Sequence, residues 1–495
     1  MAEGPRARAS CLKRLGCCAG ALLLIAGILT GIAWVVLVRM YGIRDDVGWI
    51  DSDRKKLPPH TTPVATPGNA YDGFVEATAL LSEPVEPVEP IGTVQPDWLT
   101  AVYHNRRPYI DAQLPAVRDI VERNGATLAK IHEAAARPIW AVPSDDSIDI
   151  DRKLRALARL SNNAALFAHV QGDDAEALTH VEDCLVLSVA CEQRDNAGAF
   201  MVGRAAGGIG AMIGRYVLTQ RNLSPGRLRE HAALVRDLRG RLVPVSEVVT
   251  RWARNALSFY DKVEAATTHD AAEMMYPPRM YLAAYGREAP TAERLDERLH
   301  VMIARRDLAR SRAWAEDRYA RYLDELSKPL WLADPESMDG RKEADIAARN
   351  DLWAHTIVND LAYQAHTYQQ YQATLLAEEV IASIEAYRGE HGAYPADLAR
   401  LVPEYMPEMP IDPWTGKPML YARVPEGYKL YAAGPNKRDD GGWMNGNALK
   451  GPDHVFVPVQ IGTWDPNLPE VPPAPLAVES QPSDDSGGPQ NAKSG

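Results

Sequence analysis

The stretch Glu385–Gly442 decides the fold of the C-terminal part of this chain. It reads EAYRGEHGAYPADLARLVPEYMPEMPIDPWTGKPMLYARVPEGYKLYAAGPNKRDDGG. Two short runs in it, Met419–Arg423 and Tyr428–Ala433, have the composition of strands. Pro425-Glu426-Gly427 lies between them and predicts a hairpin. A small antiparallel sheet is therefore expected here.

Apolar residues on both sides of this stretch extend the pattern. Those from Leu361 to Tyr387 recur at helical spacing and predict a long helix that ends near Gly389–Gly392. A short helical turn is expected from Tyr394, and Val455–Val459 reads as a third strand. One long helix packed on a small antiparallel sheet is an α+β arrangement.

The order and spacing of these residues resemble the C-terminal globular region of major pseudopilins of bacterial type II secretion. The matching motifs are Gly392-Ala393-Tyr394-Pro395, Asp412-Pro413-Trp414, Gly416-Lys417-Pro418, Gly427-Tyr428 and Asp439-Asp440-Gly441-Gly442. The likeness covers about a fifth of the 495 residues. It implies a pseudopilin-like α+β domain over residues 350–462.

The resemblance also carries a metal prediction. In the major pseudopilins the loop after the second strand binds calcium. By position, the resemblance implies that Asn436, Asp439, Asp440 and Asp453 supply oxygen ligands, the kind that calcium requires. The alternative is a plain turn in which aspartates accept hydrogen bonds from backbone amides. The residues alone leave both interpretations open.

Residues 98–349 have a helical pattern. Ser224 is a predicted N-cap with Pro225 in the first turn of a helix, and Gly172–Ala175 predicts a turn between two helices. This turn chemistry resembles that of tetratricopeptide-like helical hairpins, but no repeat has a fixed period. The buried stripe expected after Ser224 consists of Leu228, Ala232, Val235, Leu238 and Leu242.

Several sequence features in this region and in the N-terminal tail are candidate sites. Five glycines from Gly203 to Gly214 fit no phosphate-loop spacing and lie in a helical pattern, so they predict close helix packing. The acidic cluster Asp145–Asp151 precedes basic residues and predicts a helix N-terminus. Of the hydrolase and redox motifs, only Ser10-Cys11-Leu12-Lys13 matches one, in a tail where catalysis is not expected. No catalytic residue is therefore assigned.

The N-terminal region predicts a membrane anchor. Leu15–Val38 contains no charged residue and is long enough to cross a bilayer. Basic residues in the tail 1–14 place that tail in the cytoplasm and the bulk of the chain in the periplasm. A cleaved signal peptide is the alternative, but no small-residue cleavage site follows the apolar run. Residues 39–97 are rich in proline and predict a stalk, with the segment Tyr71–Leu81 as a candidate short helix that docks elsewhere. Residues 463–495 predict a disordered tail.

The whole chain is thus expected to be mainly α, with a transmembrane helix, a helical hairpin domain and a pilin-like α+β domain. Its net charge of −12 argues against a nucleic-acid partner. Cys184 and Cys191 would lie two helical turns apart, too far for a disulfide.

Because the anchor lies over three hundred positions before the pilin-like domain, assembly into a filament is not favoured. The predicted function is a membrane-anchored bacterial envelope scaffold or interaction module, with a protein partner in the envelope and a link to a type II secretion or pilus-like system. The alternative is an extracytoplasmic enzyme with a pocket in the helical domain.

Overall fold

The computed structural model describes most of the chain between residues 55 and 458. The described ranges are 55–59, 62–86, 97–143, 148–220, 222–266, 308–334, 361–425, 427–442 and 453–458. The predicted anchor 15–38, the predicted tail 463–495 and the expected domain boundary at 349/350 lie outside them. No helix within these ranges is long and apolar enough to cross a membrane.

The described residues are mainly helical, with one three-stranded antiparallel sheet. The helices are α2 (Ala70–Thr78), α3 (Trp98–Tyr103), α4 (Arg107–Arg123), α5 (Gly125–Ala135), α6 (Ile148–Val170), α7 (Asp174–Glu192), α8 (Ala197–Leu218), α9 (Pro225–Gly240), α10 (Val245–Ala265), α14 (Leu308–Leu326) and α17 (Leu361–His391), with a 3-10 turn η2 (Leu398–Leu401). The strands are β1 (Leu420–Val424), β2 (Gly427–Ala432) and β3 (His454–Val457), with β2 in the centre.

The chain forms two compact units. One comprises residues 1–59, 249–328 and 333–362, and the other comprises 60–248, 329–332 and 363–495. In the first unit, Arg312 of α14 donates through Nε to Asp261 Oδ1 of α10 at 2.8 Å. Tyr319 and Tyr322 of α14 are fully buried. The pocket, the predicted calcium ligands and the sheet all belong to the second unit.

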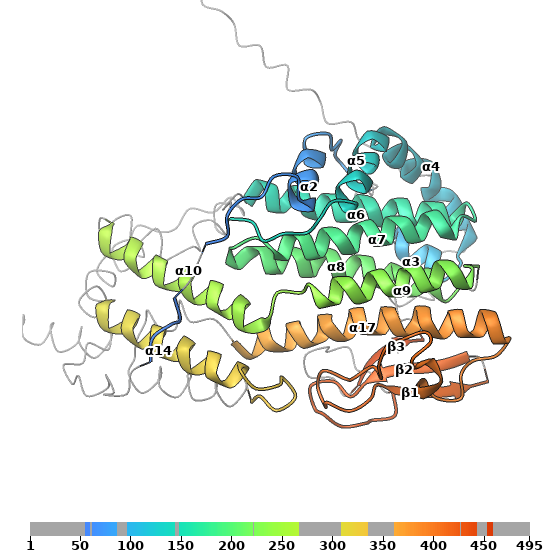
Figure 1. Cartoon of the computed structure of the whole chain (residues 1–495). Coiled ribbons are helices and arrows are strands. Elements are labelled where there is room, and N and C mark those ends of the chain that lie inside the picture. The colour runs from blue at the N-terminus through green and yellow to red at the C-terminus, as the bar shows by residue number, and fades with distance from the viewer. Residues whose placement is uncertain are drawn as a thin grey trace, which may run out of the picture. The chain divides into compact units, whose positions relative to one another are not determined.

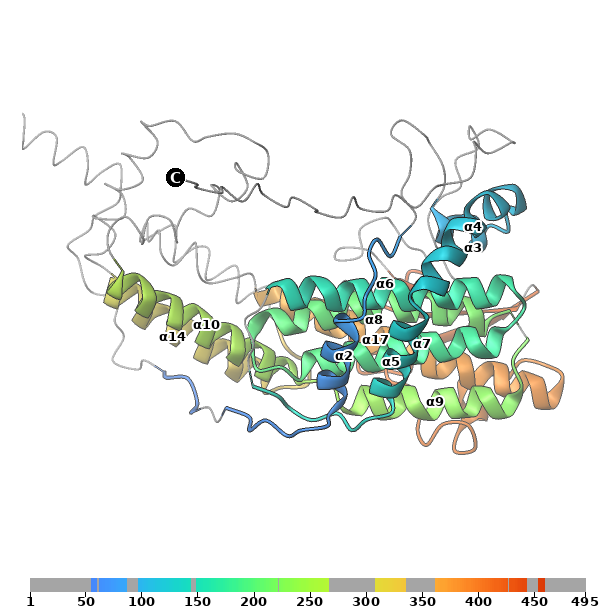
Figure 2. The same ribbon diagram turned by 90° about the horizontal axis from the view of Figure 1, so that it is seen from above.

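In the second unit, α6, α7, α8 and α9 run side by side, and α17 lies between this helical layer and the sheet (Figures 1 and 2). Every residue of α17 from 373 to 386 is buried. A helix that is buried on all sides packs within a core and not at a surface. A single hydrophobic core accordingly includes residues of the helical layer, of α17 and of all three strands or their flanks.

Local sequence signals set the ends of several elements as expected. Ser224 Oγ accepts from Arg227 N at 3.3 Å and caps α9, and the stripe after it is buried. Gly172, at a φ of +86°, makes the turn into α7, which Asp173 caps. The predicted long helix, the hairpin strands and the third strand are present within a few residues of their expected bounds.

Part of the predicted stalk belongs to the fold. Helix α2 packs against α5, with Phe74 fully buried. Beyond it, Val85 is also buried, and its carbonyl accepts from Asn163 Nδ2 at 2.7 Å. Residues 70–86 therefore lie against the helical layer, because the apolar side chains between the prolines pack in its core.

The glycine cluster of α8 packs against neighbouring helices, as predicted. A Cβ at Gly203 would lie 2.6 Å from the carbonyl oxygen of Ser188 on α7. One at Gly207 would overlap the hydroxyl of Tyr371 on α17, and one at Gly214 would overlap the carboxylate of Glu378. These glycines let α7 and α17 approach α8 closely.

Candidate functional site

The four predicted calcium ligands lie close together in the structure. Asn436, Asp439 and Asp440 follow β2, and Asp453 immediately precedes β3. Asp453 Oδ2 accepts from the backbone N of Asp440 at 3.1 Å and from that of Gly442 at 2.7 Å. Asn436 Nδ2 donates to Asp440 Oδ2 at 2.7 Å.

These contacts are those of an aspartate-capped turn. Asp439 Oδ1 accepts from Gly441 N at 2.9 Å and from the Tyr431 hydroxyl at 3.1 Å. Burial raises the pKa of Asp453, and the carboxylates of Asp440 and Asp439 raise it further. Among the described residues, no group of three or more acidic, histidine or cysteine side chains is arranged to hold a metal ion. Calcium binding at these residues stays a prediction.

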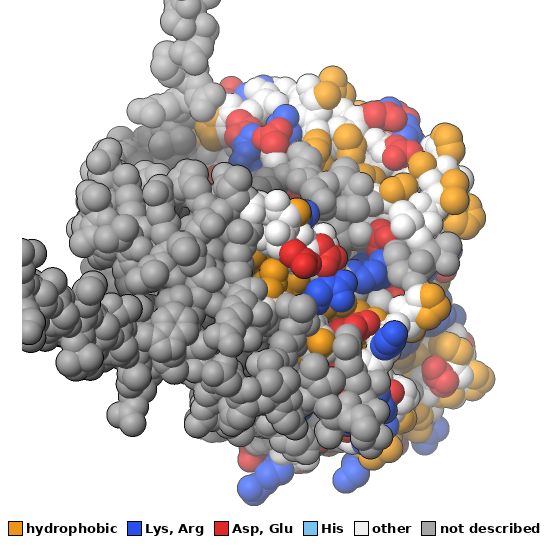
Figure 3. Space-filling view, turned by 90° about the vertical axis from the view of Figure 1, so that its left-hand side faces the viewer, with side chains coloured by type: hydrophobic (Ala, Val, Ile, Leu, Met, Phe, Trp, Pro, Cys, Tyr) orange, Lys and Arg blue, Asp and Glu red, His pale blue; other side chains and the backbone are white. Residues whose placement is uncertain are grey.

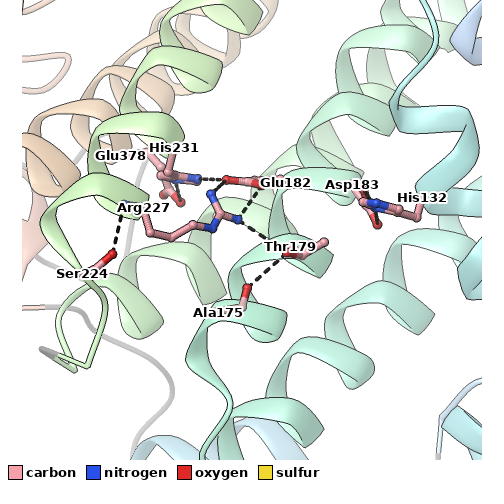
Figure 4. Close-up of polar contacts among 9 residues, drawn as sticks. All are labelled: His132, Ala175, Thr179, Glu182, Asp183, Ser224, Arg227, His231 and Glu378. Atoms are coloured by element: carbon pink, nitrogen blue, oxygen red, sulfur yellow. Dashed lines mark hydrogen bonds and ion pairs between the residues drawn. The ribbon is translucent and has the colours of Figure 1, made fainter.

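A partly buried chain of charges connects α7, α9 and α17 (Figure 4). Arg227 holds Glu182 through two hydrogen bonds of 2.6 and 2.7 Å. His231 Nδ1 lies 3.0 Å from Glu182 Oε1, and His231 Nε2 lies 3.3 Å from Glu378 Oε1. The side chains of His231 and Glu378 are both fully buried. Burial alone would lower the pKa of His231, but the two glutamates outweigh it and raise the pKa.

A second set of ion pairs fixes α9 to α17. Glu379, which is buried, accepts from Arg236 Nε at 2.7 Å and from Arg239 Nη2 at 3.0 Å. Near the end of α17, Arg229 pairs with Glu390 at 2.8 Å. The contacts from Arg236 and Arg239 neutralise the Glu379 carboxylate, which would otherwise be costly inside the core.

We call the sheet and the described residues between α17 and β1 the C-terminal module. A pocket of about 840 Å³ lies between the helical layer and this module. Its lining comes from the C-terminal ends of α3, α6 and α8, from α17 and from the ends of the strands. This volume is within the range of roughly 300–1,000 Å³ that is typical of small-molecule sites. The pocket combines aromatic and polar side chains.

A histidine with a fixed orientation lines this pocket. His169 Nδ1 lies 2.5 Å from Asp174 Oδ1, and Asn222 Nδ2 donates to the other oxygen of Asp174 at 2.6 Å. Burial alone would raise the pKa of Asp174, but the hydrogen bonds from His169 and Asn222 lower it. Asp174 therefore stays ionised and accepts the hydrogen bond from His169 Nδ1, so Nε2 is the ring nitrogen that remains for another hydrogen bond.

Two pairs of tyrosines line the same pocket. We call Tyr103 and Tyr216 the helical pair; their ring centroids are 5.5 Å apart. We call Tyr394 and Tyr428 the sheet pair; their centroids are 5.0 Å apart. Burial raises the pKa of Tyr216 to about 12, so its hydroxyl stays protonated at neutral pH.

This pocket was not predicted from the sequence. Glu385, Tyr394 and Tyr428 stood out only as parts of the pseudopilin-like motifs, and His169 and Tyr103 carried no signal at all. The lining residues come from positions 103 to 458, so no local spacing relates them. The four predicted calcium ligands do not line the pocket.

Comparison with known proteins identifies no relative of this chain. No protein-family model, no curated protein and no solved structure matches this chain. The likeness to the major pseudopilins thus rests on the motifs in the sequence.

Proposed function

We propose that this protein is a membrane-anchored bacterial envelope protein that acts as a scaffold or interaction module beside a type II secretion or pilus-like system. In this proposal residues 15–38 hold it in the membrane. The helical hairpins and the pilin-like module then form one interaction unit in the periplasm.

The burial of α17 carries the proposal. A filament subunit needs one face of its long helix free to pack on neighbouring subunits. Here residues 373–386 are buried by the helical layer and the C-terminal module of the same chain. Ion pairs from Arg236 and Arg239 to Glu379 reinforce this packing. A pilin-like module fixed in this way supports a scaffold more than a filament subunit.

The described surface suits a protein partner. On the coloured part of the face in Figure 3, acidic and basic side chains lie side by side. Mixed charge of this kind favours specific contacts with proteins over binding to a uniform polyanion.

A topology experiment tests the proposal. In a chain with Cys11, Cys17 and Cys18 changed to serine, a maleimide that cannot cross the inner membrane is applied to cells with a permeabilised outer membrane. Thr66→Cys, an exposed position, should be labelled, whereas Ala2→Cys should be labelled only after lysis. Labelling of Thr66→Cys only after lysis would overturn the periplasmic placement. The complex extracted in mild detergent should also be larger than the purified protein.

The second candidate is an extracytoplasmic enzyme. The oriented His169–Asp174 pair in the pocket favours it, since such a pair serves as a general base in many enzymes. No serine or cysteine is among the described lining residues, so the pair has no such nucleophile beside it in the described part. Hydrolysis of a bound ligand, lost on His169→Asn, would favour the enzyme.

A further inference from the structure

The pocket between the helical layer and the sheet offers flat apolar surfaces together with hydrogen-bonding groups. The helical pair and the sheet pair supply the aromatic rings, and the amides of Asn105 and Gln220 and the hydroxyl of Thr219 lie among them. Aromatic side chains combine a large apolar face with a polar edge. A ligand that fits must have both flat apolar faces and many hydrogen-bonding groups.

The charges of the lining argue against an anion. Helices α3, α6 and α8 contribute their C-terminal ends, where the helix dipole is negative. Lys429 is the one lysine or arginine among the described lining residues. A phosphate or sulfate group would therefore meet an unfavourable potential.

A cation and a lipid also fit this pocket poorly. Glu385 lines the pocket, but Arg388 Nε donates to its Oε2 at 2.6 Å, so its charge is largely compensated. A lipid tail would remove the polar groups of the lining from water without replacing their hydrogen bonds, which is costly. A neutral ligand rich in hydroxyl groups meets neither penalty.

Two polar groups in the pocket are suited to such a ligand. His169 offers Nε2 for a hydrogen bond because its Nδ1 is engaged by Asp174. The Tyr428 hydroxyl is buried and makes no hydrogen bond of ordinary geometry within the described part of the chain, although Glu385 lies near enough to help raise its pKa. A buried hydroxyl in this state gains from a ligand that bonds to it.

We propose that this pocket binds a short oligosaccharide of uncharged sugar units, whose ring faces pack on the helical and sheet pairs and whose hydroxyls bond to His169 and Tyr428. The proposal goes beyond the envelope role and does not rest on it, since it concerns the folded second unit alone. The proposed glycan binding is therefore independent of whether residues 15–38 are confirmed as a membrane anchor.

The test is calorimetric titration of the full chain, purified in a detergent without a sugar head group. The probes are tetra-N-acetylchitotetraose and cellotetraose, each added to millimolar concentration. At least one should bind with a Kd below about 1 mM. Tyr428→Phe keeps the ring and removes one hydrogen bond, so it should weaken binding about 5-fold. Tyr103→Ala removes a ring and should weaken it at least about 10-fold.

Two controls show whether a loss of binding is specific to the pocket. Tyr431→Phe makes the same change on the same strand outside the pocket and should leave the Kd unchanged. A thermal melt of Tyr428→Phe should match the unsubstituted chain, which separates lost binding from lost fold.

Three results would overturn the proposal. The first is no heat with either oligosaccharide, and the second is binding that Tyr428→Phe and Tyr103→Ala leave unchanged. The third is binding of tetramethylammonium with no sugar binding, which would identify the tyrosines as a cation cage. None of these results bears on the topology experiment.

Discussion

The close contact between α8 and α17 at Gly207 can be tested by adding a single methyl group. A Cβ at this position would overlap the Tyr371 hydroxyl and lie 2.5 Å from Ser188 Oγ. The Ser188 hydroxyl donates to the Gly203 carbonyl at 2.7 Å, so Tyr371 donates to Ser188 in their 2.5 Å hydrogen bond. Tyr371 is buried and cannot move aside without breaking this bond.

The effect of Gly207→Ala can be worked out from these contacts. Overpacking a core costs about 1–3 kcal/mol, and leaving the buried Tyr371 hydroxyl without its partner costs about 1–3 kcal/mol. Alanine is favoured over glycine in a helix by about 1 kcal/mol, which offsets part of this cost. We expect a net destabilisation of about 3 kcal/mol.

Gly208 provides the matched control. It is the next residue of α8, it is exposed, and a Cβ there would meet no atom within 4 Å. Gly208→Ala should therefore stabilise the protein by up to about 1 kcal/mol. Urea denaturation of the two variants and the unsubstituted chain measures both changes. Equal stability of Gly207→Ala and Gly208→Ala would refute the packing of α8 against α17.

Calorimetric titration of calcium into the full chain should show heat of binding, and calcium should raise the melting temperature. The double substitution Asp439→Ala with Asp440→Ala should abolish both effects. No heat at millimolar calcium would mean that these aspartates only cap the turn. The raised pKa of His231 means that its contribution to stability is complete below its unfolded pKa of about 6.5 and is lost as pH rises through the folded value. Urea denaturation across that range should show this loss, and His231→Gln should remove this part of the pH dependence. Arg236→Ala removes a 2.7 Å ion pair to a buried carboxylate that keeps Arg239 as a partner, so it should destabilise the protein by about 1–3 kcal/mol. Arg241→Ala, which removes an exposed pair of the same length, should change stability by less than about 0.5 kcal/mol, and equal losses would contradict the assigned burial.

Features that depend on neighbouring residues could be predicted from the sequence. The cap at Ser224 and the hairpin strands of the C-terminal module follow from local chemistry, because a cap or a tight turn needs only a few adjacent residues. The burial of Glu378 and Glu379 in the predicted long helix could not be predicted in this way, since their partners come from α9, more than a hundred positions away.

The candidate pocket could not be predicted for the same reason. Tyr103 and Pro458 line one cavity from nearly opposite ends of the described chain. The buried pairing of His169 with Asp174 spans a helix turn that was predicted, but its position beside two tyrosine pairs depends on the packing of α3, α8 and the sheet. The meeting of these distant residues in one pocket depends on tertiary packing, which a single sequence does not show.

The central position of α17 also sets the order in which the protein can fold. Ser188 and Tyr371, bonded to each other in the core, are 183 positions apart in the chain. During synthesis the helical layer from α6 to α9 is complete long before α17 has been made, and its apolar face has no cover in that interval. Contacts of such long sequence range also slow folding. A cell that makes this protein must therefore keep an unfinished helical layer from aggregating until residue 391 has been made.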